Sequence, residues 1–158
     1  MEKSESPFAP IDILKELLGC DAPDFNVKTI EGEEISFKSL RDKVIVINFW
    51  FIGCKPCVEE MPRLNDIVDL YKDKNVVFLS FARDIEEDIQ KKFLPKRTFK
   101  YKIIPEAHDV INRYCVQPYP THFVIEKSGK VAYTAFDSMM KEANYQKFRA
   151  AIESAVGK

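Results

Sequence analysis

The fold is decided by the stretch Val44-Ile45-Val46-Ile47-Asn48-Phe49-Trp50-Phe51-Ile52-Gly53-Cys54-Lys55-Pro56-Cys57. Up to Phe51 it is apolar and rich in β-branched residues, broken only by Asn48, which is typical of a strand buried on both faces. Two cysteines follow, and a helix-like segment extends from about Pro56 to Tyr71. The pattern predicts a central strand that ends in a cysteine pair at the start of a helix.

The rest of the chain alternates strand and helix patterns around this unit. We predict strands at 24–30, 34–37, 76–81, 101–104, 121–126 and 131–136, and helices at 11–18, 85–93, 107–114 and 143–156. The turn signal Glu31-Gly32-Glu33 makes the first two strands a hairpin. This order indicates an α/β fold with a central mixed sheet flanked by helices on both faces and an N-terminal hairpin extension. We divide the chain into an N-terminal segment with a short helix, 1–19, and one domain, 20–158.

Composition limits the classes of function. The 158 residues suit one domain, and 46% hydrophobic with 31% charged residues is ordinary for a soluble globular protein. The net charge is −1 and no basic run is present, so we expect no nucleic-acid partner. No apolar run is long enough to span a membrane. The start at Met1 lacks the apolar stretch of a signal peptide, which leaves a cytoplasmic protein or the loss of a leader as alternatives.

The cysteine pair has a setting that favours redox chemistry. Cys54 precedes a helix, where unpaired backbone N–H groups and the helix dipole stabilise a thiolate. Lys55 adds a positive charge, and Pro56 suits a first helical turn. A bare C-x-x-C also occurs in zinc sites and structural disulfides, but the strand, C-x-P-C and helix together favour a redox-active pair.

The stretch Asn48-Phe49-Trp50 to Cys54-Lys55-Pro56-Cys57-Val58-Glu59-Glu60-Met61-Pro62 resembles the extracytoplasmic thioredoxin-like proteins of the TlpA and ResA type. The likeness continues in Ala22-Pro23-Asp24-Phe25, in Tyr119-Pro120-Thr121 and in Gly129-Lys130-Val131, and covers roughly residues 20–156. The resemblance implies a thioredoxin-like fold and thiol–disulfide exchange with protein or small-thiol partners, in the reducing direction, in the periplasm. It also implies a redox-recycling partner, no cofactor and no metal. We expect a monomer.

The resemblance also implies roles for single residues. Cys54 is similar to the attacking thiolate, Cys57 to the resolving thiol, Pro120 to the cis-proline that faces the disulfide, and Glu60 to the acidic residue that tunes the resolving thiol. An ordinary surface carboxylate is the alternative for Glu60. We expect six residues to meet the substrate: Trp50, Gly53, Lys55, Pro56, Tyr119 and Thr121. Gly53 stands where the family usually has Trp, and Asn48 stands where cytoplasmic thioredoxins have a buried Asp.

The remaining cysteines and the histidines give weaker signals. Free cysteines are usually buried, so we expect Cys20 and Cys115 to be packing residues, with a third redox thiol or a Cys20–Cys115 bridge as alternatives. His108 and His122 are lone histidines at irregular spacing and are not expected to bind metal.

Three other functions remain as alternatives. A thiol peroxidase usually needs Thr or Ser three residues before the attacking cysteine, where this chain has Phe51. A copper- or zinc-binding module would use the C-x-x-C pair and a histidine. A redox-silent structural domain would use neither.

Overall fold

A computed structural model of the chain describes residues 14–158. Residues 14–16 are helical, so this end of the predicted helix 11–18 is confirmed, and the part before residue 14 lies outside the described residues. Most of the predicted segment 1–19 likewise lies outside them. Within 14–158, no helix has the length and apolar content needed to cross a bilayer.

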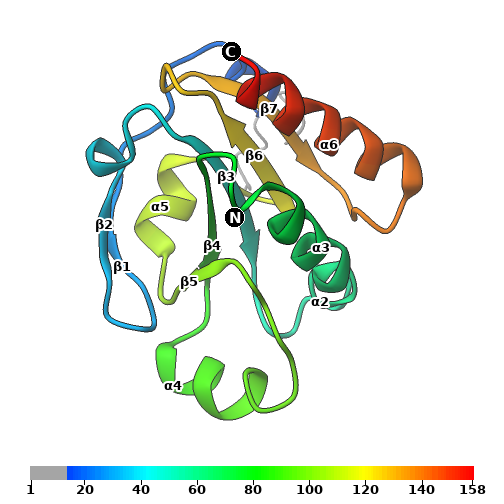
Figure 1. Cartoon of the computed structure of the whole chain (residues 1–158). Coiled ribbons are helices and arrows are strands. Elements are labelled where there is room, and N and C mark those ends of the chain that lie inside the picture. Colours follow the sequence, from blue (N-terminus) through cyan, green and yellow to red (C-terminus); the bar gives the residue numbers. More distant parts are fainter. Residues whose placement is uncertain (1–13) are drawn as a thin grey trace, which may run out of the picture.

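A five-stranded mixed sheet forms the centre of the fold, in the order β5-β4-β3-β6-β7 (Figure 1). The strands are β3 (Val44–Trp50), β4 (Val76–Ala82), β5 (Lys102–Ile104), β6 (Thr121–Ile125) and β7 (Val131–Phe136). β3 is parallel to β4 and antiparallel to β6. Strands β1 (Asn26–Lys28) and β2 (Glu34–Ser36) pair as a separate antiparallel hairpin, followed by the 3-10 helix η1 (Phe37–Leu40). The predicted sheet and hairpin are therefore confirmed.

Helices cover both faces of the sheet. They are α2 (Lys55–Glu59), α3 (Met61–Tyr71), α4 (Glu86–Asp88), the π-helix η2 (Ile89–Phe93), α5 (His108–Arg113) and α6 (Glu142–Val156). Figure 1 shows α3 and α6 on one side of the sheet and α5 on the other. Successive side chains of a strand point to opposite faces. Val46 and Trp50 therefore pack under α3 and α6, whereas Ile47 and Phe49 pack towards α5.

The helix predicted from Pro56 to Tyr71 is divided into two helices. Glu60 separates α2 from α3, and its N–H bonds to Pro56 O at 3.3 Å. Pro62 has no N–H to donate to the carbonyl four residues earlier, so the regular ladder cannot continue through it. The break gives Glu60 a position between the cysteine pair and the longer helix.

Candidate active site

Cys54 and Cys57 form a disulfide at the junction between β3 and α2, with their Cα atoms 5.3 Å apart. Cys54 is the N-cap of α2, and the N–H of Cys57 donates to Cys54 Sγ over 3.3 Å. Cys54 is 5% exposed, whereas Cys57 is completely buried. A partner can therefore reach only the Cys54 side of the bond.

The carboxyl end of β4 holds the loop that precedes the disulfide. Asp84 accepts the N–H of Ile52 through Oδ2 at 2.8 Å, and the N–H of Arg83 donates to Trp50 O at 3.3 Å. The Arg83 guanidinium also lies 4.9 Å from the centre of the Phe51 ring, within cation–π range. These contacts fix the backbone from Trp50 to Gly53, although the sequence patterns did not single out Arg83 or Asp84.

The start of β6 lies beside the same loop. The peptide bond between Tyr119 and Pro120 is cis, and Thr121 pairs with Phe49 in the sheet register. Pro120 therefore lies alongside Trp50, at the end of β3. The Tyr119 ring meets the Phe51 ring edge to face, with centroids 5.2 Å apart. Partial burial raises the pKa of Tyr119, and the nearby Arg83 charge opposes that rise.

Glu60 is fully buried, so the interpretation of this residue as a surface carboxylate is wrong. Its Oε2 atom accepts the N–H of Met139 at 2.7 Å, and its Oε1 atom lies 2.9 Å from His122 Nε2. His122 is also fully buried, and its Nδ1 atom lies 3.4 Å from Asn48 Nδ2. A carboxylate, an imidazole and an amide are thus adjacent in the core beneath the cysteine pair.

The six residues expected to meet substrate divide into two groups. Gly53, Lys55 and Pro56 are exposed and Tyr119 is half-buried, so all four can be reached from solvent. The expectation for Trp50 and Thr121 needs correction, because both side chains are completely buried. Trp50 packs against the Phe93 and Phe99 rings, and the Thr121 hydroxyl donates to Pro118 O at 2.7 Å. These two side chains support the site from inside the protein.

A groove of about 390 Å³ lies beside Gly53. Four basic side chains and one acidic side chain line it: Lys55, Lys92, Lys96, Arg97 and Glu59. Glu59 and Asp88 offset Lys55 and Lys92, at 3.7 and 3.3 Å. Within 14–158, no ion pair involves Lys96 or Arg97, which leaves this side of the disulfide positively charged.

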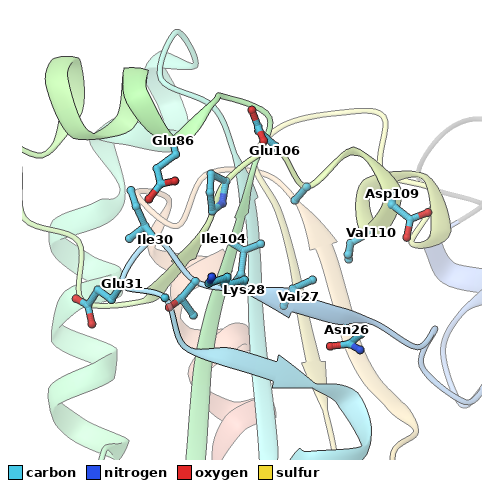
Figure 2. Close-up of a pocket in the computed structure, with 14 residues that line it drawn as sticks. Asn26, Val27, Lys28, Ile30, Glu31, Glu86, Ile104, Glu106, Asp109 and Val110 are labelled. Carbon is cyan, nitrogen blue, oxygen red and sulfur yellow. The ribbon is translucent and has the colours of Figure 1, made fainter.

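A second hollow, of about 580 Å³, lies between the β1–β2 hairpin and α5 (Figure 2). Glu31, Glu86, Glu106 and Asp109 lie around it, with Lys28 among them. Neither the disulfide nor Pro120 contributes to its lining. It is therefore a different place from the redox pair.

Cys20 and Cys115 are free and exposed, so the expectation that they are buried packing residues is wrong, and they form no bridge. Cys115 has a φ of 55° just after α5. Among residues 14–158, no group of three or more His, Cys, Asp or Glu side chains is arranged to hold a metal ion.

A disulfide at the start of a helix, in a mixed sheet of this order, defines the class of thioredoxin-fold dithiol oxidoreductases. The AhpC/TSA family matches residues 18–134, and the chain belongs to that family. Its relatives show that it is a thiol–disulfide oxidoreductase. It is 36% identical to the thiol-disulfide oxidoreductase ResA of Bacillus cereus over 79% of this chain and 73% of that one. It is 30% identical to the thioredoxin-like protein YneN of Bacillus subtilis, over 82% and 77%.

Solved structures agree on the fold. A Chlorobium tepidum protein designated a thiol:disulfide interchange protein DsbE superposes with a TM-score of 0.79 at 24% identity, over 88% of this chain and 97% of that one. StoA of Bacillus subtilis superposes with a TM-score of 0.64 at 22% identity, over 75% and 90%. The predicted thioredoxin-like fold is confirmed.

Sequence reasoning did not identify His122 as part of the site. Its place two residues after Pro120 puts it on the face of β6 opposite to Thr121, which the alternation of a strand could have indicated. Its contact with Glu60 depends on how α3 lies over the sheet, and no local pattern carries that information.

Proposed function

We propose that the protein reduces disulfides in partner proteins, with Cys54 as the nucleophile and Cys57 as the resolving thiol. The observation that carries this proposal is the unequal burial of the two cysteines, because Cys54 is 5% exposed whereas Cys57 is completely buried. In the dithiol state, the Cys57 N–H and the position of Cys54 at the start of α2 would favour a Cys54 thiolate. Lys55, one residue away and exposed, adds positive charge.

The reaction proceeds in two exchanges. The Cys54 thiolate attacks one sulfur of the partner's disulfide, which forms a mixed disulfide and releases the other sulfur as a thiolate. Cys57 then loses its proton to Glu60 and attacks Cys54 Sγ. The Cys54–Cys57 disulfide forms, the second partner sulfur leaves as a thiolate, and two electrons have moved to the partner. A separate dithiol must then reduce the protein again.

The exposed surroundings of Cys54 supply the surface for the partner. The segment at Tyr119 and Pro120 presents backbone beside the disulfide, where an extended peptide can pair as an added strand. The groove at Gly53 opens on the other side, and its excess of positive charge favours an acidic stretch near the partner's disulfide. Specificity would then come from both the backbone edge and the groove.

Direction and compartment follow from the resemblance of the motif. The C-x-P-C pair followed by Glu60, Met61 and Pro62 is similar to the extracytoplasmic TlpA and ResA type, and the curated relatives include ResA. We therefore propose that the protein acts as a reductant outside the cytoplasm. A reduction potential near that of thioredoxin, about −270 mV, would fit this direction, whereas one near −120 mV would fit an oxidase.

Reduction of insulin disulfides by a chemical dithiol, followed by turbidity, tests the proposed function. We expect the wild-type protein to accelerate it, the Cys54→Ser variant to give the uncatalysed rate, and Cys20→Ser to match the wild type. Equal rates with wild type and Cys54→Ser would contradict the proposal.

A further inference from the structure

Three buried polar side chains from distant parts of the chain meet beneath the disulfide. Asn48 on β3, His122 on β6 and Glu60 between α2 and α3 are all completely buried. Asn48 and His122 are opposite each other in the antiparallel register, and both point to the face covered by α3 and α6. Glu60 reaches down to His122 from above the sheet, with 2.9 Å between Oε1 and Nε2.

Glu60 Oε1 and His122 Nε2 lie within ion-pair distance, at 2.9 Å, but not in hydrogen-bond geometry. Within 14–158, neither atom has a well-aligned hydrogen bond, to the other or to a third group. The flanking positions on the same face of the two strands, Val46 and Val124, are apolar. Burying a carboxylate and an imidazole in such a core is costly unless they pair, and an apolar pair would fill the space at lower cost. The pair therefore points to a role in the reaction.

The neighbouring amide fits both tautomers of the imidazole. In the orientation shown, Asn48 Nδ2 can donate to His122 Nδ1, 3.4 Å away, which puts the ring proton on Nε2, facing Glu60. Asn48 Oδ1 has no partner among the described residues. If the amide turned over, that oxygen would accept the N–H of Nδ1, and Nε2 would be free to accept a proton carried by Glu60.

The site proposed for proton transfer lies one helical turn away. Cys57 and Glu60 are three residues apart in a helical backbone and are both fully buried, so they share a face. Without a neighbouring base, the Glu60 carboxyl group would have to hold the proton from Cys57 by itself. With Nε2 of the imidazole at 2.9 Å and its own ring proton on Nδ1, the same proton can rest on either partner, and the pair as a whole is then uncharged in the core.

We propose that His122 is a positioning residue that orients Glu60 and shares the proton which Glu60 takes from Cys57. This inference rests on the proposed function. In the second exchange, the Cys57 thiol gives its proton to the pair and the Cys57 thiolate attacks Cys54 Sγ. The partner sulfur leaves as a thiolate, and the pair later returns its proton to that thiolate or to water.

Other groups around the pair do not replace this role. Cys57 faces it from α2, and Tyr101 faces it from the segment before β5. Burial and the charge of the carboxylate raise the pKa of Tyr101 well above its usual value, so its hydroxyl remains protonated. Tyr133 on β7 is kept protonated by burial in the same way. Phe148 is the α6 contact to the imidazole. Arg63 of α3 donates to Met139 O at 3.2 Å and pairs with the exposed Glu142 at 2.9 Å, so its charge is neutralised by that surface carboxylate.

Release of a partner from the mixed disulfide at Cys54, measured in single turnover from pH 6 to 10, tests this inference. The chain has two histidines, so His108→Gln on the exposed surface of α5 is a matched control for His122→Gln. Gln can still donate to Glu60 but cannot take up a proton. We expect His122→Gln to slow release about tenfold at neutral pH, and the slowing to diminish towards pH 10, because hydroxide increasingly replaces the pair as the proton acceptor. His108→Gln should match the wild type.

A wild-type profile in His122→Gln would overturn the inference and leave the proposed function intact, whereas a wild-type protein that forms no mixed disulfide would overturn both. Imidazole nitrogen NMR in the His108→Gln background observes His122 alone and needs no variant at that position. We expect Glu60→Gln to move the ring proton of His122 from Nε2 to Nδ1, because the Gln amide donates to Nε2. An unchanged position of that proton would also overturn the inference.

Discussion

Replacement of Glu60 by Ala or by Gln gives the sharpest test of the buried polar contacts. In the native protein, Glu60 accepts the N–H of Met139 at 2.7 Å and lies 2.9 Å from His122 Nε2. Glu60→Ala leaves the Met139 N–H unsatisfied and removes the carboxylate beside His122 Nε2. Each lost contact costs about 1–3 kcal/mol, and loss of the buried carboxylate recovers part of its desolvation cost. We expect the free energy of unfolding to fall by about 2–4 kcal/mol.

Glu60→Gln should be much milder, because each contact has a replacement. The Gln carbonyl can accept the Met139 N–H, and its amide can donate to His122 Nε2. The imidazole proton then moves to Nδ1, where the unpartnered Asn48 Oδ1 can accept it. We expect a loss of about 1 kcal/mol, which is typical of a substituted hydrogen bond.

Urea unfolding of both oxidised variants measures the difference. With a slope near 2 kcal/mol per M, Glu60→Ala should unfold about 1 M earlier than Glu60→Gln. In a chain of this length, the same difference corresponds to a melting temperature lower by roughly 4–8 °C. Equal midpoints for the two variants would refute the reasoning, because they would mean that the Met139 and His122 contacts contribute nothing.

Two further predictions concern surface charge and a buried phenol. The double variant Lys96→Glu/Arg97→Glu should slow reduction of an acidic peptide disulfide about tenfold at low salt and much less at high salt. The reason is that the groove loses its electrostatic attraction for the acidic peptide. The control variant Arg41→Glu/Lys43→Glu, at the opposite end of β3, changes the net charge equally and should leave the rate unchanged. Burial raises the pKa of Tyr133 to about 12, so the unfolded chain loses this proton first and stability should fall from about pH 10 to about pH 12. Tyr133→Phe should reduce that fall in pH-dependent urea unfolding, and an unchanged slope would contradict the burial argument.

The sequence predicted the framework of the site because local patterns determine it. The run ending at Trp50 could only be a buried strand, and a C-x-P-C pair at its end places two sulfurs at a helix start. The hairpin followed from its turn residues. These features depend on neighbours in the chain, so one sequence was sufficient to find them.

The contacts that sequence reasoning missed depend on register and packing. His122 contacts Glu60 because β6 pairs with β3 at Asn48 and because the break between α2 and α3 directs Glu60 towards the sheet. Trp50 lies at the end of the same strand, but alternation directs it into the core, against Phe93. Cys115 is exposed and has a positive φ. The average burial of cysteine residues predicts neither feature.

Trapping of the mixed disulfide tests the central claim most directly. The reduced Cys57→Ser variant is mixed with a protein disulfide, and the adduct is digested and mapped by mass spectrometry. We predict one adduct, joined through Cys54, because within the disulfide pair this cysteine alone retains exposed surface. An adduct joined through exposed Cys20 or Cys115 instead, or no adduct at all, would contradict the account.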